Sequence, residues 1–302
     1  MDAPVLAIEN LSCPFGARAA LREIDLVLHR GEQCLVVGGT GSGKTTLARC
    51  IVGLRRTWAG KITVFGESSR DLSLRGRHRL AYLPESATLI DELRVDQLLR
   101  FTAAFYPSWD YALARELLHR FAIDPRDRCG ALALEAQRQI GLVLCLAPHP
   151  DLLVLDEPAR ELDSTARRDL LETLVEHVRS EQLTLLHTTA MIEDASIVAG
   201  DIAILHQGRI RLRGPPDRLQ REAKEILITR PGEGELPEIP ALIQAWRKEH
   251  VIHLTVARAD GELLATLAEK TKGTVTMRDL SLAELYRACT RRRPQERQDV
   301  RV

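Results

Sequence analysis

The sequence predicts an α/β protein with a mixed sheet core, a helical insertion and a small second α/β domain. An apolar strand at Gln33–Val37 runs directly into a glycine cluster and then into a helical pattern, which is typical of parallel α/β sheets. Apolar strand-like runs return at Leu152–Leu155, Leu183–Leu186 and Ile202–Leu205, separated by helix-like segments. Between these two parts, residues 95–146 have helical periodicity.

The remaining elements follow from local patterns. Short strands are expected at Val5–Ile8 and Ile24–Leu28, on either side of the turn signal at Gly16. After Gly214-Pro215-Pro216, strand and helix patterns alternate at Ile226–Thr229, Ala241–Arg247, Val251–Val256, Leu263–Lys270, Val275–Met277 and Leu282–Ala288. We therefore expect a large domain over 1–214 with a helical subdomain at about 86–148, an accessory α/β domain over 222–290 and a basic tail over 291–302.

The composition excludes several classes of protein. The chain has 302 residues, with 42 Lys and Arg balanced by 42 Asp and Glu, so its main task is not to coat nucleic acid. No apolar run reaches the 18 or so residues of a membrane span, and no signal-peptide pattern opens the sequence. The six cysteines are scattered without a CxxC pair, which favours reduced thiols inside the cell.

The glycine cluster carries the strongest functional signal. It follows the pattern GxxxxGK[ST] between the strand and the helix, which is the pattern of a phosphate-binding loop. Backbone amides of such a loop surround phosphate oxygens, the lysine reaches the β- and γ-phosphates, and the hydroxyl after it can ligate Mg²⁺. The residues are Gly38-Gly39-Thr40-Gly41-Ser42-Gly43-Lys44-Thr45-Thr46. We predict that the chain binds a nucleoside triphosphate.

A second motif, Leu152–Pro158, consists of four apolar residues followed by two carboxylates and a proline. A buried strand would hold Asp156 toward Mg²⁺, and Glu157 could act as the general base toward an attacking water. The pattern alone also fits an ordinary strand end with solvated carboxylates. Its position about 110 residues after the phosphate loop favours a catalytic role.

Together these motifs resemble the ATP-binding subunit of an ABC transporter. The resemblance covers roughly residues 5–212 and includes Phe15-Gly16, Val64-Phe65-Gly66, Glu161-Leu162-Asp163 and Ala203–Ile210. Leu83-Pro84-Glu85, Phe105–Asp110 and Ser281–Tyr286 resemble the export branch of the family, whose permeases are separate chains.

This resemblance implies a P-loop NTPase fold, with 1–214 as the ABC nucleotide-binding domain and ATP and Mg²⁺ as cofactors. Phe15 would stack on adenine, and Thr45, Glu85 and Asp156 would ligate magnesium. Expected partners are a membrane permease and a second ABC cassette, with no nucleic acid. The protein would then be cytoplasmic, peripheral on the cytoplasmic face of the cell membrane.

The sequence departs from the family at the LSGGQ signature, which contacts ATP bound to the opposite cassette. The usual spacing places it at Leu132–Ala136, where the serine and both glycines are absent and Glu135 is present. At about 4 Å and an effective dielectric of 20, two like charges repel by about 4 kcal/mol. A shift of one residue, which would use Gln137, supplies no serine either.

The switch histidine is also absent. The alignment places Thr189 at its position, so a shorter, uncharged hydroxyl would act there; His187 is an alternative or a structural core residue. Glu85 replaces a glutamine, and a carboxylate is also a good magnesium ligand. We therefore assign candidate catalytic roles to Glu157, Glu85 and Thr189.

Six aromatic residues gather in the helical stretch and admit two interpretations. They form either the core of a small subdomain or a groove for a permease helix. Likewise, the arginines of the tail either meet anionic lipid or form a solvated end. The aromatic residues are Phe101, Phe105, Tyr106, Trp109, Tyr111 and Phe121.

Two functions are compatible with these motifs, and a third does not fit the length of the chain. The first is an energy-coupling ATPase subunit of an exporter, whose hydrolysis needs a partner cassette with an intact signature. The second is a nucleotide-gated cassette with a structural or regulatory role in an asymmetric assembly that does not hydrolyse ATP. A soluble ABC protein of translation or chromosome work would need tandem cassettes or a long coiled coil, and this length fits neither.

Overall fold

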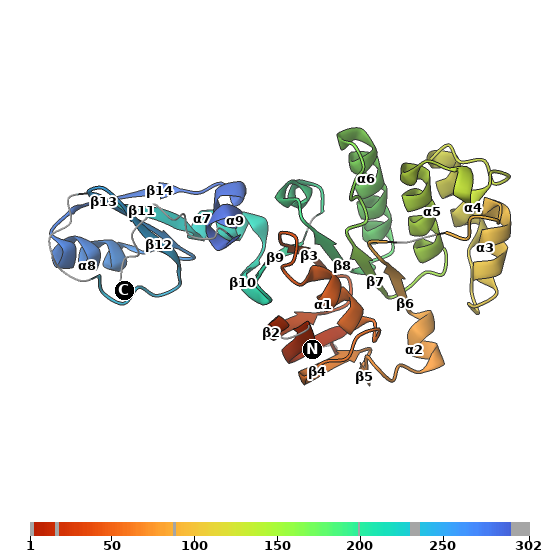
Figure 1. The fold of residues 1–302 in the computed structure, drawn as a ribbon, viewed down its shortest axis with the longest axis horizontal. Helices are drawn as coiled ribbons and strands as arrows, with labels where there is room; N and C mark the ends of the chain where they lie inside the picture. The colour runs from red at the N-terminus through yellow and green to blue at the C-terminus, as the bar shows by residue number, and fades with distance from the viewer. Residues whose placement is uncertain (1–2, 16–17, 87–88, 199, 230–235, 291–302) are drawn as a thin grey trace. The chain divides into compact units, whose positions relative to one another are not determined.

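The structure is a computed structural model that describes residues 3–15, 18–86, 89–198, 200–229 and 236–290. The chain forms two compact units, coloured from red to blue along the sequence in Figure 1. The first unit contains residues up to Gly200 together with Gln207–Arg209, and the second contains Asp201–His206 and the chain from Ile210 onward.

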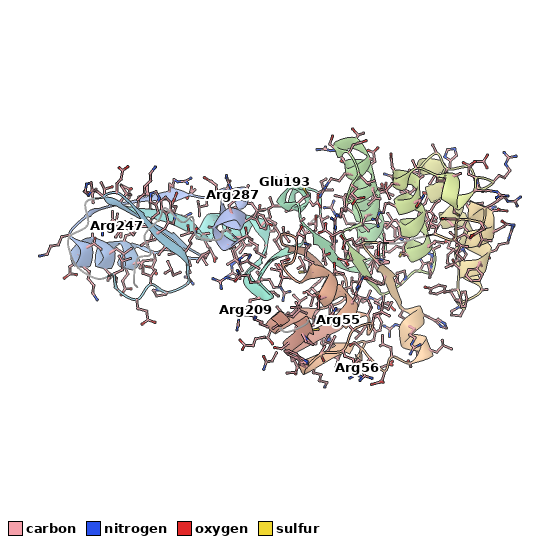
Figure 2. All side chains as sticks on the ribbon, in the orientation of Figure 1. Arg55, Arg56, Glu193, Arg209, Arg247 and Arg287 are labelled. Atoms are coloured by element: carbon pink, nitrogen blue, oxygen red, sulfur yellow. The ribbon has the colours of Figure 1, made fainter. Side chains whose placement is uncertain are left out.

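An antiparallel sheet opens the first unit. Its strands are β1 (Leu6–Phe15), β2 (Arg18–Leu28), β4 (Ala59–Val64) and β5 (Glu67–Ser68), in the order β2-β1-β4-β5. β1 is central, with Leu6 opposite both Leu28 and Val64. Arg55 connects this sheet to the segment after the glycine cluster, because its guanidinium donates to the carbonyl of Pro14 at 2.7 Å; Figure 2 labels this side chain.

Parallel strands form the centre of the first unit, in the order β3-β8-β7-β6. They are β3 (Gln33–Val37), β8 (Thr184–Thr189), β7 (Leu152–Asp156) and β6 (Leu80–Leu83). Every residue of β7 and β8 is buried, as expected for strands covered on both faces. The register places Val37 beside Thr189, and Asp156 beside Thr188. The carboxyl ends of β3, β7 and β8 therefore meet at one edge.

Helices cover these strands and extend to one side. α1 (Lys44–Ile51) contacts β7 and β8. α6 (Ser164–Ser180) is preceded by the N-cap residue Asp163, whose carboxylate accepts from the amides of Thr165 and Ala166. The remaining short helices are α2 (Leu74–His78) and η2 (Ile192–Ser196).

The helical pattern expected between the motifs is present. It consists of α3 (Val95–Ala103), α4 (Tyr111–Arg120), the 3₁₀ turn η1 (Cys129–Ala131) and α5 (Leu134–Leu146). α5 contacts α3, α4 and β6, and Figure 1 shows these three helices gathered in one part of the first unit. The expected helical subdomain thus has α5 as its link to the parallel strands.

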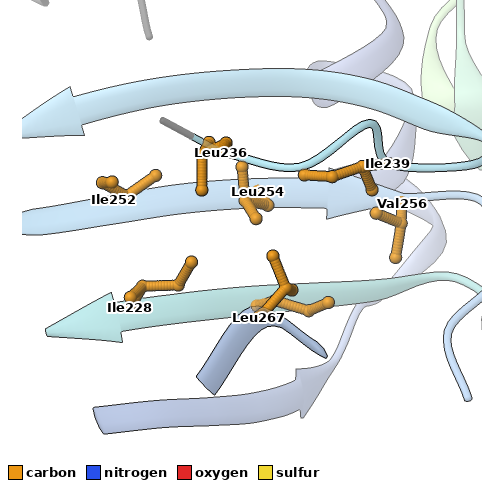
Figure 3. Close-up of a cluster of buried hydrophobic side chains, with 8 residues drawn as sticks. Ile228, Leu236, Ile239, Ile252, Leu254, Val256 and Leu267 are labelled. Carbon is orange, nitrogen blue, oxygen red and sulfur yellow. The ribbon is translucent and has the colours of Figure 1, made fainter. Parts of the chain in front are cut away.

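The second unit is built around an antiparallel sheet in the order β12-β13-β11-β14. Alternate residues of β11 and β13 point into one core, which α8 completes. Figure 3 shows this cluster, which contains Ile226, Ile228, Leu236, Ile239, Ile252, Leu254, Val256 and Leu267. The elements are β9 (Asp201–His206), β10 (Arg209–Gly214), α7 (Pro216–Glu222), β11 (Lys224–Thr229), β12 (Leu242–Lys248), β13 (Val251–Val256), α8 (Gly261–Thr271), β14 (Thr274–Asp279) and α9 (Leu282–Thr290).

Candidate nucleotide-binding site

The glycine cluster forms a loop between β3 and α1. Gly41 and Gly43 have positive φ angles of 78° and 114°, which glycine adopts without steric cost. A Cβ at Gly43 would lie 2.7 Å from the carbonyl oxygen of Ala20, so only glycine fits there. A Cβ at Gly39 or Gly41 would meet no atom within 4 Å. The loop therefore leaves open space in front of the amino end of α1, where a phosphate group would bind.

Lys44 lies across this loop and is almost completely buried. Its ammonium donates to the carbonyl of Gly38 at 2.6 Å and to that of Gly39 at 3.3 Å. It also forms an ion pair with Glu157, with 3.0 Å between Nζ and Oε1. The two side chains are 6% and 10% exposed, so this is a buried pair. The structure thus brings the predicted phosphate-binding lysine and the predicted general base into direct contact.

Three oxygen-bearing side chains lie beside this pair. The hydroxyl of Thr45 is 3.3 Å from Asp156 Oδ1 and 3.3 Å from Glu85 Oε2. Asp156 Oδ1 also accepts a 2.7 Å hydrogen bond from the hydroxyl of Thr188 on the neighbouring strand. The three predicted magnesium ligands, Thr45, Glu85 and Asp156, therefore meet at one point.

Glu157 is held by the backbone on two sides. Its φ angle of 51° is uncommon for a residue with a side chain and carries a cost of order 1–3 kcal/mol. The amide of Glu157 donates to the carbonyl of Thr188 at 3.0 Å, and its Oε2 accepts from the amide of Ala190 at 3.1 Å. These contacts fix the carboxylate next to Lys44.

The donor set fits magnesium and a triphosphate. Among the described residues, Asp156 Oδ2 and the Ser42 hydroxyl are buried without a hydrogen-bond partner, so each is available to bind a ligand at the site. Magnesium prefers oxygen ligands, commonly one or two carboxylates plus substrate phosphates. Nowhere in the described ranges do three or more His, Cys, Asp or Glu side chains form a metal site. The metal would accordingly depend on phosphate oxygens for part of its coordination.

Thr189 is placed away from these ligands. Its hydroxyl donates to Asp194 Oδ2 at 2.7 Å and accepts from the amide of Met191 at 3.1 Å. Asp194 is 2% exposed and forms an ion pair with Arg167 at 2.6 Å. The next residue, Ala190, is the one whose backbone reaches Glu157. Its side chain is a methyl group, so this end of β8 offers the site an amide and no ionisable group.

His187 is also a core residue in this structure. It is fully buried, and neither ring nitrogen has a hydrogen-bond partner among the described residues. Burial lowers the pKa of this imidazole to about 4, with a smaller lowering contribution from Arg167 and an opposing one from Asp194. His187 is therefore neutral at pH 7 and interacts with the Asp194–Arg167 pair, on the side of Thr189.

The expected signature segment spans the start of α5. Ala133 is the N-cap residue and makes no side-chain capping bond. Serine is strongly preferred at this position, because its hydroxyl can accept from a free amide of the first turn. Glu135 lies exposed in the first turn, where Gln139 donates to its carboxylate at 3.4 Å. Gln137 donates instead to the carbonyl of Leu132 at 2.9 Å. The surface at the amino end of α5 is thus carboxylate-bearing and lacks a capping hydroxyl.

Some expectations lie outside the described residues, and some contacts were not expected. The side chain of Phe15 and the tail 291–302 are not described. Thr40, inside the loop, is exposed, and Thr46, in the first turn of α1, is half-buried. Arg160, whose guanidinium contacts Glu85, belongs to none of the sequence motifs. Only its position three residues after Glu157 could have indicated it.

In the part of the chain that the structure describes, no helix is both long and apolar enough to cross a bilayer. The model of the family "ABC transporter" matches residues 21–160. The chain is 27% identical to the ABC transporter ATP-binding protein YtrB of Bacillus subtilis over 222 residues, 74% of this chain and 76% of that protein. It is 30% identical to the sulfate/thiosulfate import ATP-binding protein CysA 2 of Agrobacterium fabrum over 236 residues, 74% of this chain and 68% of that protein.

Other curated relatives are longer, so that the chain spans as little as 60% of their length. Among solved structures, an ATP-binding subunit of an ABC transporter matches with a TM-score of 0.63 at 27% identity, over 72% of this chain and 92% of that one. Cassettes of this kind bind ATP with Mg²⁺, and the loop, the lysine and the oxygen ligands described above fit that pair. The chain has the P-loop fold of these cassettes and belongs to the ABC transporter ATP-binding family.

Proposed function

We propose that this chain is the energy-coupling subunit of an ABC transporter and that it hydrolyses ATP at its own phosphate loop when a partner cassette supplies the signature. The observation that carries this proposal is the contact between Lys44 and Glu157, because it keeps the phosphate-binding cation and the general base within 3.0 Å. A cassette with only a structural role would not need both groups.

Each residue then has a defined task. Lys44 exchanges its contacts with Gly38 and Gly39 for phosphate oxygens, and the amides of the loop bind the remaining oxygens. Thr45, Asp156 and Glu85 would hold magnesium, which would supply positive charge beside the phosphates when bound. Glu157, released from Lys44, accepts a proton from the attacking water.

The partner cassette is proposed to be a different chain. In a pair of identical chains, each ATP would face the amino end of α5, where Glu135 is exposed and Ala133 supplies no hydroxyl. A carboxylate so close to a γ-phosphate is repelled, because both groups are negative and a closed sandwich excludes water. A mixed pair keeps one favourable site, formed by this chain's loop and the partner's signature.

A second candidate is a cassette that binds ATP without hydrolysing it. Thr189 favours it, because its hydroxyl is occupied by Asp194, and so does Ala190, because its methyl group cannot contact a γ-phosphate by hydrogen bonding. The two candidates differ in one measurable respect, namely whether the carboxylate of Glu157 is required for turnover.

The permease contact is proposed to lie on the helical part of the first unit. Phe101 and Phe105 on and after α3 are 51% and 62% exposed, and their rings pack edge to face at 5.3 Å. Exposed aromatic pairs are favoured anchors in interfaces. Recruitment through a permease would place the chain on the cytoplasmic face of the membrane.

The direction of transport is part of the same proposal. Export is supported by the segment Leu83-Pro84-Glu85, whereas CysA 2 is an import protein by its name. Transport into or out of vesicles that contain the complete transporter distinguishes the two directions.

The experiment restores the signature in this chain, so that no partner is needed. The four substitutions Ala133→Ser, Leu134→Gly, Glu135→Gly and Ala136→Gln rebuild it, and phosphate release from ATP is measured for the purified chain with and without them. The unaltered chain should be almost inactive, and the restored chain active. Adding Glu157→Gln should lower that activity by about 10²–10⁴-fold, whereas the exposed Glu172→Gln is the matched control.

Two results would contradict the proposal. Turnover near 10 per second by the unaltered chain, about the median for enzymes, would show that its signature segment is functional. Full activity of the restored chain after Glu157→Gln would show that Glu157 is not the base and would favour the second candidate.

A further inference from the structure

Arg160 contacts Glu85, one of the three proposed magnesium ligands. It lies in the turn that follows β7, where its amide donates to the carbonyl of Glu157 at 3.1 Å. Its guanidinium Nη1 forms an ion pair with Oε1 of Glu85, and its Nε lies 3.8 Å from Glu161. The turn that carries the general base therefore also carries a cation that reaches Glu85.

The two oxygens of Glu85 have different partners. Oε1 faces Arg160, whereas Oε2 is 3.3 Å from the hydroxyl of Thr45. The same hydroxyl is 3.3 Å from Asp156 and has one proton, which the two carboxylates must share. Arg160 thus binds the outer oxygen of Glu85 and leaves the inner oxygen directed at Thr45 and Asp156.

The charges at the site explain why such a cation is needed. Glu85 and Asp156 both face the hydroxyl of Thr45, and Lys44 compensates the charge of Glu157. Without Arg160, the charge of Glu85 would stand uncompensated at the hydroxyl that it shares with Asp156, and like charges repel. The same charge would also oppose the phosphates of an incoming nucleotide.

We propose that Arg160 is a positioning residue for Glu85: it holds this carboxylate at Thr45 and balances its charge, so that Glu85 serves as a magnesium ligand without repelling ATP. The inference rests on the proposed role of Glu85 as a magnesium ligand. The net charge of Glu85 and Arg160 together is zero, the same as that of a glutamine at position 85.

The size of the effect follows from exposure. The side chains of Arg160 and Glu85 are 47% and 28% exposed, so solvent screens the pair. Pairs of this kind are typically worth up to about 1 kcal/mol, which corresponds to an effect of up to about fivefold on binding. The sign of the change is therefore more informative than its size.

The test measures the affinity of a fluorescent ATP analogue for the full chain, once with excess Mg²⁺ and once with EDTA. The ratio of the two affinities reports how strongly magnesium assists nucleotide binding. Arg160→Ala should raise this ratio about two- to fivefold, because the unbalanced Glu85 weakens binding without magnesium. Glu85→Gln should lower the ratio, because a free Arg160 then attracts the phosphates directly.

The double variant Glu85→Gln, Arg160→Ala should return the ratio to within about twofold of the unaltered chain, because both charges are gone. Arg160→Lys keeps the charge and should also stay within about twofold. Arg168→Ala is the matched control, since Arg168 is an exposed arginine on α6 that pairs with Glu172. A ratio restored in the double variant cannot result from a folding defect of the single variants.

Each other outcome has a definite meaning. If Glu85→Gln lowers the ratio but Arg160→Ala behaves like Arg168→Ala, the positioning role is overturned and the proposed function stands. If neither variant changes the ratio, Glu85 is not a magnesium ligand, and that part of the proposed function fails. If the double variant departs from the unaltered chain more than either single variant does, the two residues act independently and the inference is overturned.

Discussion

Removing the charge of Lys44 should do more than weaken nucleotide binding, because it leaves Glu157 buried without its cation. The pair is 6% and 10% exposed, with 3.0 Å between the charged atoms. Breaking a buried ion pair by removing one partner costs about 3–5 kcal/mol. Glu157 retains the amide of Ala190, so we expect the lower end of this range for Lys44→Met. In a unit of this size, about 3 kcal/mol lowers the Tm by roughly 6–12 °C.

The second substitution separates stability from binding. Glu157→Gln in the Lys44→Met background removes the unpaired charge, so most of the lost stability should return, to within about 1 kcal/mol of the unaltered chain. Nucleotide binding should not return, because the loop then has no lysine to bind the phosphates. The exposed Lys61→Met serves as control and should change neither property.

The assay is thermal unfolding of the full chain with and without Mg-ATP. Because the chain forms two compact units, the transition that shifts with Mg-ATP in the unaltered chain is the one to follow. In both Lys44 variants this transition should no longer respond to ATP. The reasoning is refuted if Lys44→Met alone melts like the unaltered chain, or if the double variant melts below the single one.

Three further predictions concern the surroundings of the site. The pKa of His187 is about 4 in the folded chain and ordinarily near 6.5, so the unfolded chain binds this proton at a higher pH than the folded chain does. The free energy of unfolding should therefore fall by about 3 kcal/mol as the pH drops from about 6.5 to about 4. His187→Leu should reduce this loss, which denaturant titrations at about pH 7.5 and about pH 4.5 measure. Thr189→Val should cost about 1–2 kcal/mol, because Asp194 loses a buried donor, with no change in Mg-ATP affinity by calorimetry. Phe101→Ser with Phe105→Ser should abolish co-sedimentation with permease-containing membranes while ATP affinity stays the same; unchanged co-sedimentation would place the permease contact elsewhere.

The elements around the phosphate loop could be predicted because their signals are local. The strand expected at Gln33–Val37 has the same bounds as β3, and the helix after the glycine cluster is α1. Asp156 ends β7, as its place after four apolar residues indicates. Such features depend on neighbours along the chain, so that one sequence is enough to locate them. The strands expected at Ile226–Thr229, Val251–Val256 and Val275–Met277 are confirmed for the same reason. The segment Ala241–Arg247, which has a helix position in the alternating pattern, instead forms strand β12, because pairing with β13 outweighs its local preference.

Contacts between distant segments could not be predicted in this way. Glu85 and Arg160 come from separate segments of the chain, and no local pattern connects a residue after β6 with one after β7. The Lys44–Glu157 ion pair could not be predicted either, because each motif indicates a contact with phosphate or water and neither indicates a contact with the other motif. The parallel order β3-β8-β7-β6 brings these residues together, and that order depends on the whole sheet.

The end of β8 shows how one position can change an assignment. Alternate side chains of a strand point to opposite faces, so His187 and Thr189 share one face, and Thr188 and Ala190 share the other. The hydroxyl of Thr188 donates to Asp156 at the site, whereas that of Thr189 donates to Asp194. The face with Thr188 and Ala190 is therefore the one toward the site, and the face with His187 and Thr189 points away from it. The alignment assigns the switch position to Thr189, whereas the geometry favours Ala190. A histidine introduced by Ala190→His should therefore increase the turnover of the restored-signature chain, whereas Thr189→His should destabilise the buried Asp194–Arg167 pair; the opposite result would return the switch role to position 189.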